Sequence, residues 1–342
     1  MKLYEKIKHD QVYVIAEMSA NHGGKIENAY KIIEQAAQAG ADCVKIQTYT
    51  ADTLTIDCRK PQYCIEGGLW DGMNYYDLYN QAMTPWDWQD KLKCKCEDCG
   101  IDFLSTPFDF TAVDFLENIG VEFYKIASYE LVDIPLIEYV ASKGKPIVMS
   151  VGMGSVEEIQ EAIDACKKAG NEQIVLLKCC SQYPAEYKNM NLSVITDMKQ
   201  RFGFPVGLSD HSFGSLAPVI AIALGAKVIE KHVCLEGVDS PDSGFSMSMK
   251  EFGDMVQEIR KTEIILGNST YERTEHEKKG MVGRRSLVAV KAIAEGEVFT
   301  SKNVRSIRPA IGLKPKYYEK LLGRKAKQSY EFGDPILDKE IE

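Results

Sequence analysis

Short apolar runs alternate with helical patterns over most of this 342-residue chain, and this alternation restricts its fold more than any other feature. A short apolar run between turn signals is typical of a buried strand, whereas apolar positions three or four apart are typical of a helix. The predicted strands are Val12–Ala16, Cys43–Gln47, Ile101–Ser105, Glu122–Ile126, Pro146–Ser150, Ile174–Cys179, Val206–Leu208 and Lys227–His232. The predicted helices are Lys25–Ala39, Pro85–Cys99, Phe110–Asn118, Pro135–Ser142, Val156–Ala169, Leu192–Arg201, Leu216–Leu224 and Lys250–Leu266.

Capping residues mark the boundaries of these elements. Asp109, Asp133 and Ser155 precede predicted helices, where their side-chain oxygens can accept hydrogen bonds from first-turn N–H groups. Glycines typical of left-handed helix C-caps precede several strands, at Gly40, Gly100, Gly120, Gly170 and Gly225. Eight successive strand–helix pairs predict an α/β fold, a closed (β/α)8 TIM barrel. An open doubly wound sheet is the alternative, but no glycine-rich dinucleotide fingerprint follows the first strand.

One connection is much longer than the others. Residues Tyr49–Thr84 carry Gly67-Gly68-Leu69-Trp70 and the aromatic-rich stretch Tyr75–Tyr79. Long loops at the C-terminal face of a barrel usually serve function, so this segment is a candidate lid or specificity element. The alternative is that its aromatic residues only pack the loop against the body.

The chain is predicted to divide after Gly267. Residues 1–267 form the catalytic barrel domain, 268–284 a polar linker, and 285–342 a small β-rich domain with turns such as Glu295-Gly296-Glu297. Residues 281–342 carry 13 Lys+Arg and 8 Asp+Glu, a net charge of +5, which leaves −14 for the rest. We expect this basic tail to dock on the acidic body of its own or a second subunit, or to supply cations to an anion site.

The overall composition excludes several classes of protein. A net charge of −9 argues against a nucleic-acid partner, because phosphate backbones require a basic surface. No apolar run approaches the ~20 residues that span a bilayer, and the first ten residues are too polar for a secretion signal. We therefore expect a cytoplasmic protein with no membrane contact. The ten dispersed cysteines are expected to be reduced, and Cys94, Cys96 and Cys99 lack the fourth ligand of a structural zinc site.

Two of the five histidines end successive predicted strands. His211 follows Val206–Asp210, and His232 follows Val228–Lys231. Neighbouring parallel strands could present both imidazoles to one face, where they would suit a divalent transition metal with open positions for water and substrate. Each histidine taken alone is more often a packed or hydrogen-bonded strand end. Their matching positions favour the metal pair.

Polar side chains gather at the predicted C-terminal strand ends, which face one pocket in a barrel. Lys45, Lys125 and Lys178, together with nearby hydroxyls, resemble an anion pocket, because ammonium groups and Ser/Thr donors satisfy phosphate oxygens. A phosphorylated substrate beside a metal pair indicates chemistry on an activated water or carbonyl. A Schiff-base aldolase, which would use one lysine covalently, is the alternative from another class.

Six motifs together resemble the sialic acid synthase family. They are Ile15–His22, Lys45–Thr48, Ser105–Phe108, Tyr124–Ser128, Gly207–His211 and Ile229–His232. The tail, with Arg305-Ser306-Ile307-Arg308-Pro309, is similar to the antifreeze-like (SAF) domain of that family. The segments Glu17–His22, Gly68–Trp70 and Thr84–Trp86 are most similar to its pseudaminic acid synthase branch.

The resemblance implies a reaction in which phosphoenolpyruvate condenses with the open aldehyde form of an amino sugar and releases phosphate by C–O cleavage. For the pseudaminic branch this sugar is 2,4-diacetamido-2,4,6-trideoxy-L-altrose. Sugars leading to N-acetylneuraminic or legionaminic acid are the alternatives within the family.

The resemblance also implies roles for individual residues. His211 and His232 would hold the metal, usually Mn2+, while Glu17, Glu230 and Asp210 are candidate catalytic groups. Phosphoenolpyruvate would be held by Lys45, Thr106, Lys125, Ser128, Ser150, Ser181 and Ser209, although many members have asparagine in place of Ser181. Gln47, Tyr183 and Asp242 would lie around the sugar beside Glu17. Arg308 would reach the sugar from the partner subunit's tail, which makes the expected assembly a domain-swapped homodimer.

Overall fold

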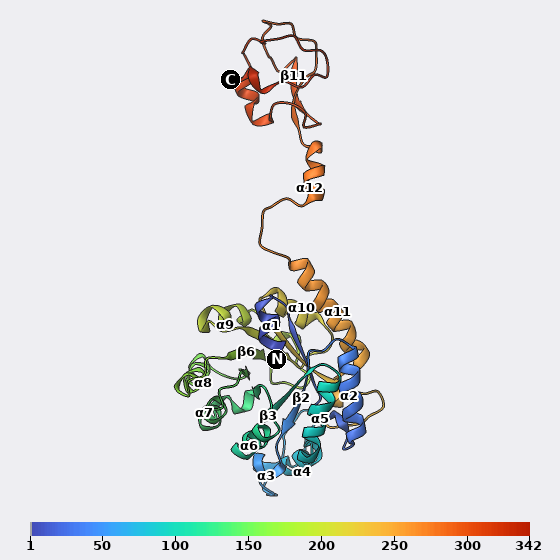
Figure 1. The fold of residues 1–342 in the computed structure, drawn as a ribbon, viewed down its shortest axis with the longest axis vertical. Helices are drawn as coiled ribbons and strands as arrows, with labels where there is room; N and C mark the ends of the chain where they lie inside the picture. The colour runs from blue at the N-terminus through green and yellow to red at the C-terminus, as the bar shows by residue number, and fades with distance from the viewer. Residues whose placement is uncertain (1) are drawn as a thin grey trace. The chain divides into compact units, whose positions relative to one another are not determined.

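The computed structural model describes residues 2–342, which form two compact units, residues 2–267 and 268–342. In the ribbon view the first unit contains strands such as β2, β3 and β6 with helices around them, and the second carries β11 and the C-terminus (Figure 1).

Eight parallel strands close into a barrel in the first unit, as the sequence predicted. They are β1 (Tyr13–Glu17), β2 (Cys43–Thr48), β3 (Asp102–Pro107), β4 (Tyr124–Ile126), β5 (Ile147–Ser150), β6 (Ile174–Cys179), β7 (Val206–Asp210) and β8 (Val228–Cys234). Each pairs with the next, and β1 also pairs with β8, so that Glu17 lies opposite His232. A two-residue strand, β9 (Met247–Ser248), pairs in parallel with the end of β8, at Val233 and Cys234.

Helices form the outer layer of the barrel. They are α2 (Ile26–Gln38), α5 (Trp86–Asp98), α6 (Phe110–Asn118), α7 (Ile134–Ala141), α8 (Val156–Lys168), α9 (Val194–Phe202), α10 (Leu216–Ala223) and α11 (Met249–Leu266). The side chains of Asp109 and Asp133 accept hydrogen bonds from backbone N–H groups in the first turn of α6 and α7. Ser155 forms a capping box with Glu158 at the start of α8. The five glycines expected at helix ends all have positive φ. The predicted punctuation therefore produces the observed helix boundaries.

Alternation along the strands separates an inner core from an outer one. The side chains that fill the barrel are Tyr13, Ile15, Cys43, Leu104, Phe123, Val148, Val175, Leu177 and Val228. Side chains of opposite parity pack against the helices in a second, larger cluster. Because successive side chains point to opposite faces, this parity decides which residues at the C-terminal strand ends face the barrel axis.

A short N-terminal helix, α1 (Lys2–Lys8), was not predicted. Its Leu3 is buried in the barrel-filling cluster, and Tyr4 and Ile7 pack against the same cluster. The Lys2 backbone N–H donates to Asp102 at the start of β3 over 2.9 Å. The helix therefore closes the end of the barrel opposite the polar strand ends.

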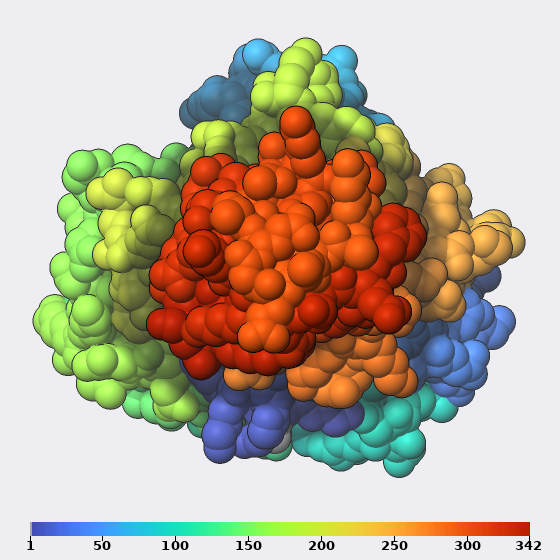
Figure 2. Space-filling model, turned by 90° about the horizontal axis from the view of Figure 1, so that it is seen from above, coloured from blue at the N-terminus to red at the C-terminus, as the bar shows by residue number. Residues whose placement is uncertain are grey.

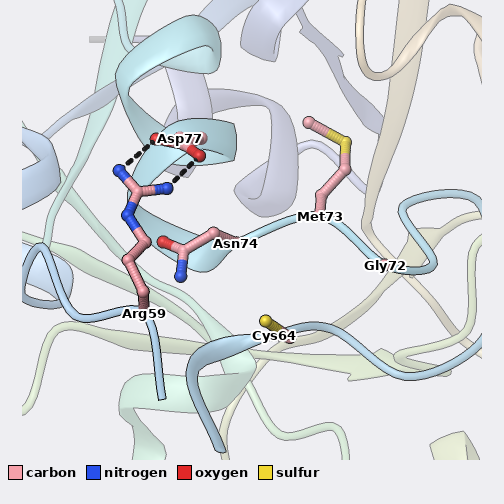
Figure 3. Close-up of a pocket in the computed structure, with 6 residues that line it drawn as sticks. All are labelled: Arg59, Cys64, Gly72, Met73, Asn74 and Asp77. Atoms are coloured by element: carbon pink, nitrogen blue, oxygen red, sulfur yellow. Dashed lines mark hydrogen bonds and ion pairs between the residues drawn. The ribbon is translucent and has the colours of Figure 1, made fainter. Parts of the chain in front are cut away.

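The long connection between β2 and α5 contains regular structure that the sequence analysis did not predict. It includes α3 (Ala51–Leu54) and α4 (Tyr75–Ala82). Arg59 makes a two-point ion pair with Asp77, beside a hollow that Cys64, Met73 and Asn74 also line (Figure 3). The segment is therefore a folded element with its own internal contacts.

The second unit has a small core around one antiparallel pair, β10 (Ser286–Ala289) and β11 (Val304–Ile307). It also contains α12 (Glu275–Gly280) and α13 (Tyr318–Leu321). Its buried apolar residues include Leu287, Phe299, Val304, Leu313, Leu321, Tyr330 and Ile336. The space-filling view shows the residues coloured orange to red as one closely packed body (Figure 2). Over residues 2–342, no helix is long and apolar enough to cross a membrane.

Gly207 provides a test of the barrel packing. A methyl group built at Gly207 would lie 2.4 Å from the Val228 carbonyl oxygen and 2.5 Å from a Leu177 methyl carbon. Gly207→Ala is therefore expected to destabilise the protein by about 1–3 kcal/mol, measured by denaturant unfolding. Gly253→Ala on α11 is the control, because its nearest neighbour is 3.6 Å away and alanine favours a helix. An unchanged unfolding midpoint for Gly207→Ala would contradict this packing.

Candidate active site

Polar residues replace apolar ones where the inward-facing side chains reach the C-terminal ends of the strands. Residues an even number of positions along a strand from a barrel-filling residue also point toward the barrel axis. At the C-terminal strand ends these are Glu17, Lys45, Gln47, Thr106, Lys125, Ser150, Ser209, Glu230 and His232. All of these except Gln47 are buried. The barrel therefore brings most of the predicted site residues to one end of its axis.

Two lysines and two carboxylates form a connected buried network. Lys125 Nζ lies 2.8 and 2.7 Å from the two carboxylate oxygens of Glu230. Lys45 Nζ lies 2.5 Å from Glu17 and 3.6 Å from Glu230, so it links the two carboxylates. Ser209 donates to Glu230 over 2.9 Å. Burial of these charges is tolerated because each has an oppositely charged partner.

The two carboxylates of this network differ in proton affinity. Burial raises the pKa of Glu17 to about 7, although Lys45 acts in the opposite direction. Burial would also raise the pKa of Glu230, but Lys125 and Lys45 outweigh it and hold this pKa well below its usual range. Two neighbouring carboxylates with separated pKa values are typical of acid–base sites, where one group stays ionised and the other exchanges a proton.

Hydroxyl groups lie around the backbone after β5. The Gly152 N–H donates to Ser128 Oγ over 3.1 Å. A methyl group at Gly152 would lie 2.7 Å from Ser128 Oγ and 2.6 Å from Ser181 Oγ, so both hydroxyls lie close to this glycine. Ser150 Oγ is buried and has no hydrogen-bond partner within residues 2–342. The group therefore has hydrogen-bonding capacity for an anion.

His211 and His232 lie side by side, with ring centroids 5.2 Å apart. His211 Nδ1 lies 2.9 Å from the Cys180 carbonyl oxygen, a contact that fixes its proton there and leaves Nε2 as an acceptor. His232 Nδ1 is buried without a partner among the described residues, and burial lowers the pKa of this imidazole well below its usual value. A neutral imidazole with a free nitrogen fits a divalent transition metal. Within residues 2–342, no group of three or more His, Cys, Asp or Glu has a metal-binding arrangement.

Aromatic rings enclose the histidine pair. The Tyr183 ring lies 4.2 Å from His211, and the Phe245 ring lies 4.9 Å from His232, between centroids. Asp242 is buried near this group, where it accepts hydrogen bonds from the Ser19 hydroxyl and the Ala20 N–H. Burial raises the pKa of Asp242.

Two predicted pocket residues lie on the outer face of their strands. Lys178 has the opposite parity to Leu177, and its Nζ donates to the Cys179 carbonyl oxygen over 2.7 Å, so its predicted place beside Lys45 and Lys125 is wrong. Asp210 has the opposite parity to Ser209 and forms a buried ion pair with Lys231, 2.6 Å apart. This position does not support a catalytic role for Asp210, because its carboxylate faces the helix layer.

The structure also identifies residues that sequence reasoning missed. Cys179 is buried with its sulfur 3.9 Å from His211 Nδ1. Glu130, two residues after Ser128, is mostly buried and has one carboxylate oxygen without a partner among residues 2–342. Phe245, on the loop after β8, completes the aromatic group. The position of Glu130 just beyond a strand end was the available signal. Phe245 offered none, because an isolated phenylalanine in a loop has no specific pattern.

The fold and site define a (β/α)8 barrel with a buried network of lysines and carboxylates and a histidine pair at its C-terminal face, followed by a small β-rich domain. The chain belongs to the NeuB family, whose model matches residues 32–271, and a SAF domain model matches residues 284–342. The SAF match agrees with the prediction for the tail.

Curated relatives match nearly the whole chain. It is 44% identical over 332 residues to the pseudaminic acid synthase of Campylobacter jejuni, which covers 97% of both chains. It is 35% identical to an N,N'-diacetyllegionaminic acid synthase from the same species, over 95% of this chain and 98% of the relative. Among solved structures, N-acetylneuraminic acid synthetase from Leptospira borgpetersenii aligns with a TM-score of 0.71 and 32% identity, over 79% of this chain and 90% of that one.

Glu130 provides a pH-dependent test of its burial, which raises the pKa of its carboxyl from 4.5 to about 7. Between these values the unfolded chain releases the proton while the folded protein keeps it, so stability falls as pH rises through this window. Glu130→Gln is therefore expected to raise the melting temperature relative to wild type at pH 8, with little difference at pH 4.5.

Glu161→Gln, at an exposed position on α8, is the matched control and should change neither value. An equal effect of Glu130→Gln at both pH values would show that its carboxyl does not titrate in this way.

Proposed function

We propose that this chain condenses phosphoenolpyruvate with 2,4-diacetamido-2,4,6-trideoxy-L-altrose and water to give pseudaminic acid and phosphate. The observation that carries the proposal is the buried network of Lys45, Lys125, Glu17 and Glu230 on the inner barrel face that also carries His232. The identity of 44% to a pseudaminic acid synthase favours this sugar over those of the other family members. The protein would be a cytoplasmic transferase.

Phosphoenolpyruvate would bind at the two-lysine end of the site. Its phosphate and carboxylate are anions, and Lys45 and Lys125 provide positive charge at buried positions where screening by water is weak. Thr106 Oγ1 lies 3.5 Å from Lys45 Nζ, and Ser209 donates to Glu230. We propose that these hydroxyls bind the substrate together with those of Ser128, Ser150 and Ser181. Their short side chains would orient the substrate without displacing the ion pairs.

The sugar would bind at the histidine end, with Gln47, Tyr183 and Asp242 around its carbon chain. His211 and His232 would hold a divalent metal, for which we propose Mn2+, and such a metal supplies Lewis-acid polarisation of a carbonyl oxygen and lowers the pKa of bound water. Glu17 would exchange a proton near neutral pH, whereas Glu230 would stay ionised and hold Lys125 in place.

The proposed reaction forms one carbon–carbon bond and breaks the bond between carbon 2 and the phosphate oxygen. Carbon 3 of the enol attacks the sugar aldehyde carbon, and the aldehyde oxygen takes a proton, for which Glu17 is the donor within the site. The cationic carbon 2 then accepts water, which returns one proton to Glu17 and leaves a hydroxyl on carbon 2. The bond between carbon 2 and the phosphate oxygen then breaks as this hydroxyl passes its proton to the departing phosphate and becomes the keto oxygen, and the lysines stabilise that phosphate.

The Schiff-base aldolase remains the alternative from another class, and Lys125 is the observation that favours it. Burial lowers the pKa of Lys125, and a neutral amine is what Schiff-base chemistry requires. Borohydride trapping in the presence of pyruvate separates the two mechanisms. A lysine adduct would contradict the synthase proposal, whereas chelator-sensitive phosphate release from phosphoenolpyruvate would support it.

Substitution of the histidine pair tests the metal site. His211→Ala and His232→Ala are each expected to lower phosphate release by more than about 100-fold. Each variant keeps only one of the two protein ligands, and one ligand cannot hold the metal. The measurement is a coupled phosphate assay with Mn2+ and a panel of amino sugars, including those leading to legionaminic and N-acetylneuraminic acid. His9→Ala, at an exposed position, is the control. Full activity in both site variants would contradict the proposed ligands.

The SAF domain would complete the site of a second subunit in a domain-swapped homodimer. We propose that the exposed Arg308, directly after β11, binds the sugar's acetamido group in the partner's barrel. Arg308→Ala should then raise the Michaelis constant for the sugar about tenfold or more and affect phosphoenolpyruvate less. Arg305→Ala, also exposed, is the matched control.

Mixing two impaired subunits tests the swap itself, when the rate is measured at a sugar concentration well below the wild-type Michaelis constant. An equal mixture of reassembled Arg308→Ala and His232→Ala subunits is expected to regain roughly a quarter of the wild-type rate, because half the dimers then contain one complete site out of two. No gain over the separate variants would show that each tail serves its own barrel.

A further inference from the structure

Trp70 is attached to the body by its ring and by its indole N–H. It lies on the turn between Ile65 and Asn74 of the long β2–α5 connection, where the Ile65 N–H donates to Met73 and the Gly72 N–H donates to Ile65. The Trp70 Nε1–H donates to the Pro241 carbonyl oxygen over 3.0 Å, in the loop after β8. The indole therefore joins two loops that are 171 residues apart in sequence.

The Trp70 ring is one ring removed from the histidine pair. Its centroid lies 5.8 Å from Tyr183 and 6.2 Å from Phe245, the two aromatic rings nearest to His211 and His232. Next to it, Leu69 approaches the backbone of Gly244, where an added Cβ would be 3.5 Å from a Leu69 methyl carbon. Trp70, Leu69 and Phe245 thus form an apolar wall beside Tyr183, which we call the outer wall. Phe245 joins this wall to the histidine pair, because its ring also lies 4.9 Å from that of His232.

The outer wall offers little hydrogen bonding to a ligand. The Trp70 indole N–H already donates to Pro241, and the side chains of Leu69 and Phe245 have no polar atoms. A methyl group placed against such a wall gains favourable contact. A hydroxyl placed there loses its bonds to water without replacement, which costs free energy.

We propose that Trp70 is a specificity-determining residue, which selects amino sugars whose carbon chain ends in a methyl group over those that end in a hydroxymethyl group. This inference rests on the proposed function, in which the sugar aldehyde lies at the histidine pair. The far end of an open-chain sugar then extends beyond Tyr183 toward the outer wall. The indole N–H also joins the β2–α5 connection to the loop that carries Asp242. Trp70 therefore positions a proposed sugar contact as well as the outer wall.

The test compares two matched sugars that differ only by a hydroxyl on carbon 6. The readout is the ratio of kcat/KM for the 6-deoxy sugar to kcat/KM for its 6-hydroxy analogue, measured by phosphate release with saturating phosphoenolpyruvate. Wild type should favour the 6-deoxy sugar by about 10-fold or more, the range that one small group in an apolar pocket provides. Trp70→Ala should reduce this ratio about tenfold, and Trp70→Phe should keep most of it because an aromatic face remains.

Two further variants make the result specific. Trp70→Gln introduces a hydrogen-bonding group at the same position, so it should shift the preference toward the 6-hydroxy sugar even if Trp70→Ala folds poorly. Trp86→Phe is the matched control, since Trp86 also donates its indole N–H to a backbone carbonyl, that of Tyr49, but packs against Phe115. It should leave the ratio unchanged.

The outcomes separate the two proposals. The proposal for Trp70 is overturned, while the synthase function stands, if wild type acts on both sugars and Trp70→Ala and Trp70→Gln both keep the wild-type ratio. An equal fall in kcat/KM for the two sugars is one such result. If wild type releases phosphate with no amino sugar of the panel, both proposals are overturned.

Discussion

The charge network of Glu17, Lys45, Glu230 and Lys125 is the interaction on which the rest of this site depends. Burying four ionisable groups is costly unless each faces a group of opposite charge type, and the closed barrel places their strands so that each does. The same arrangement separates the pKa values of the two carboxylates and places two lysine side chains at the C-terminal end of the barrel. Anion binding and proton transfer thus follow from one arrangement.

Strand parity explains how much of this site could be predicted from the sequence. The order of strands and helices was readable because apolar runs, caps and glycines mark each boundary, and the polar strand ends stood out against them. The direction of each side chain could not be predicted. These strands are apolar on both faces, so their sequences lack the apolar–polar alternation that would show which residues point inward. Lys178 and Asp210 were therefore grouped with inward-facing neighbours, although they point to the helix layer.

Tertiary contacts explain the remaining differences. Helix α1 is too short and polar to predict, and its role became visible only from the packing of Leu3 inside the barrel. Phe245 and Trp70 are far apart in sequence, so their joint position beside Tyr183 depends on two loops that no local pattern relates. The short motifs suggested the chemistry of the residues at the C-terminal strand ends. The structure added the outer wall, which we propose determines the sugar specificity.

Binding of phosphoenolpyruvate to two lysine variants tests the central claim most directly, because Lys125 and Lys178 differ in the face of the strand that carries them. Isothermal titration is expected to show affinity reduced by about 100-fold or more in Lys125→Gln, the cost of losing a buried charge contact, and unchanged in Lys178→Gln. Thermal unfolding confirms that both variants are folded. Equal affinity in Lys125→Gln and wild type, or a loss confined to Lys178→Gln, would contradict the assignment of the inward charge network to this substrate.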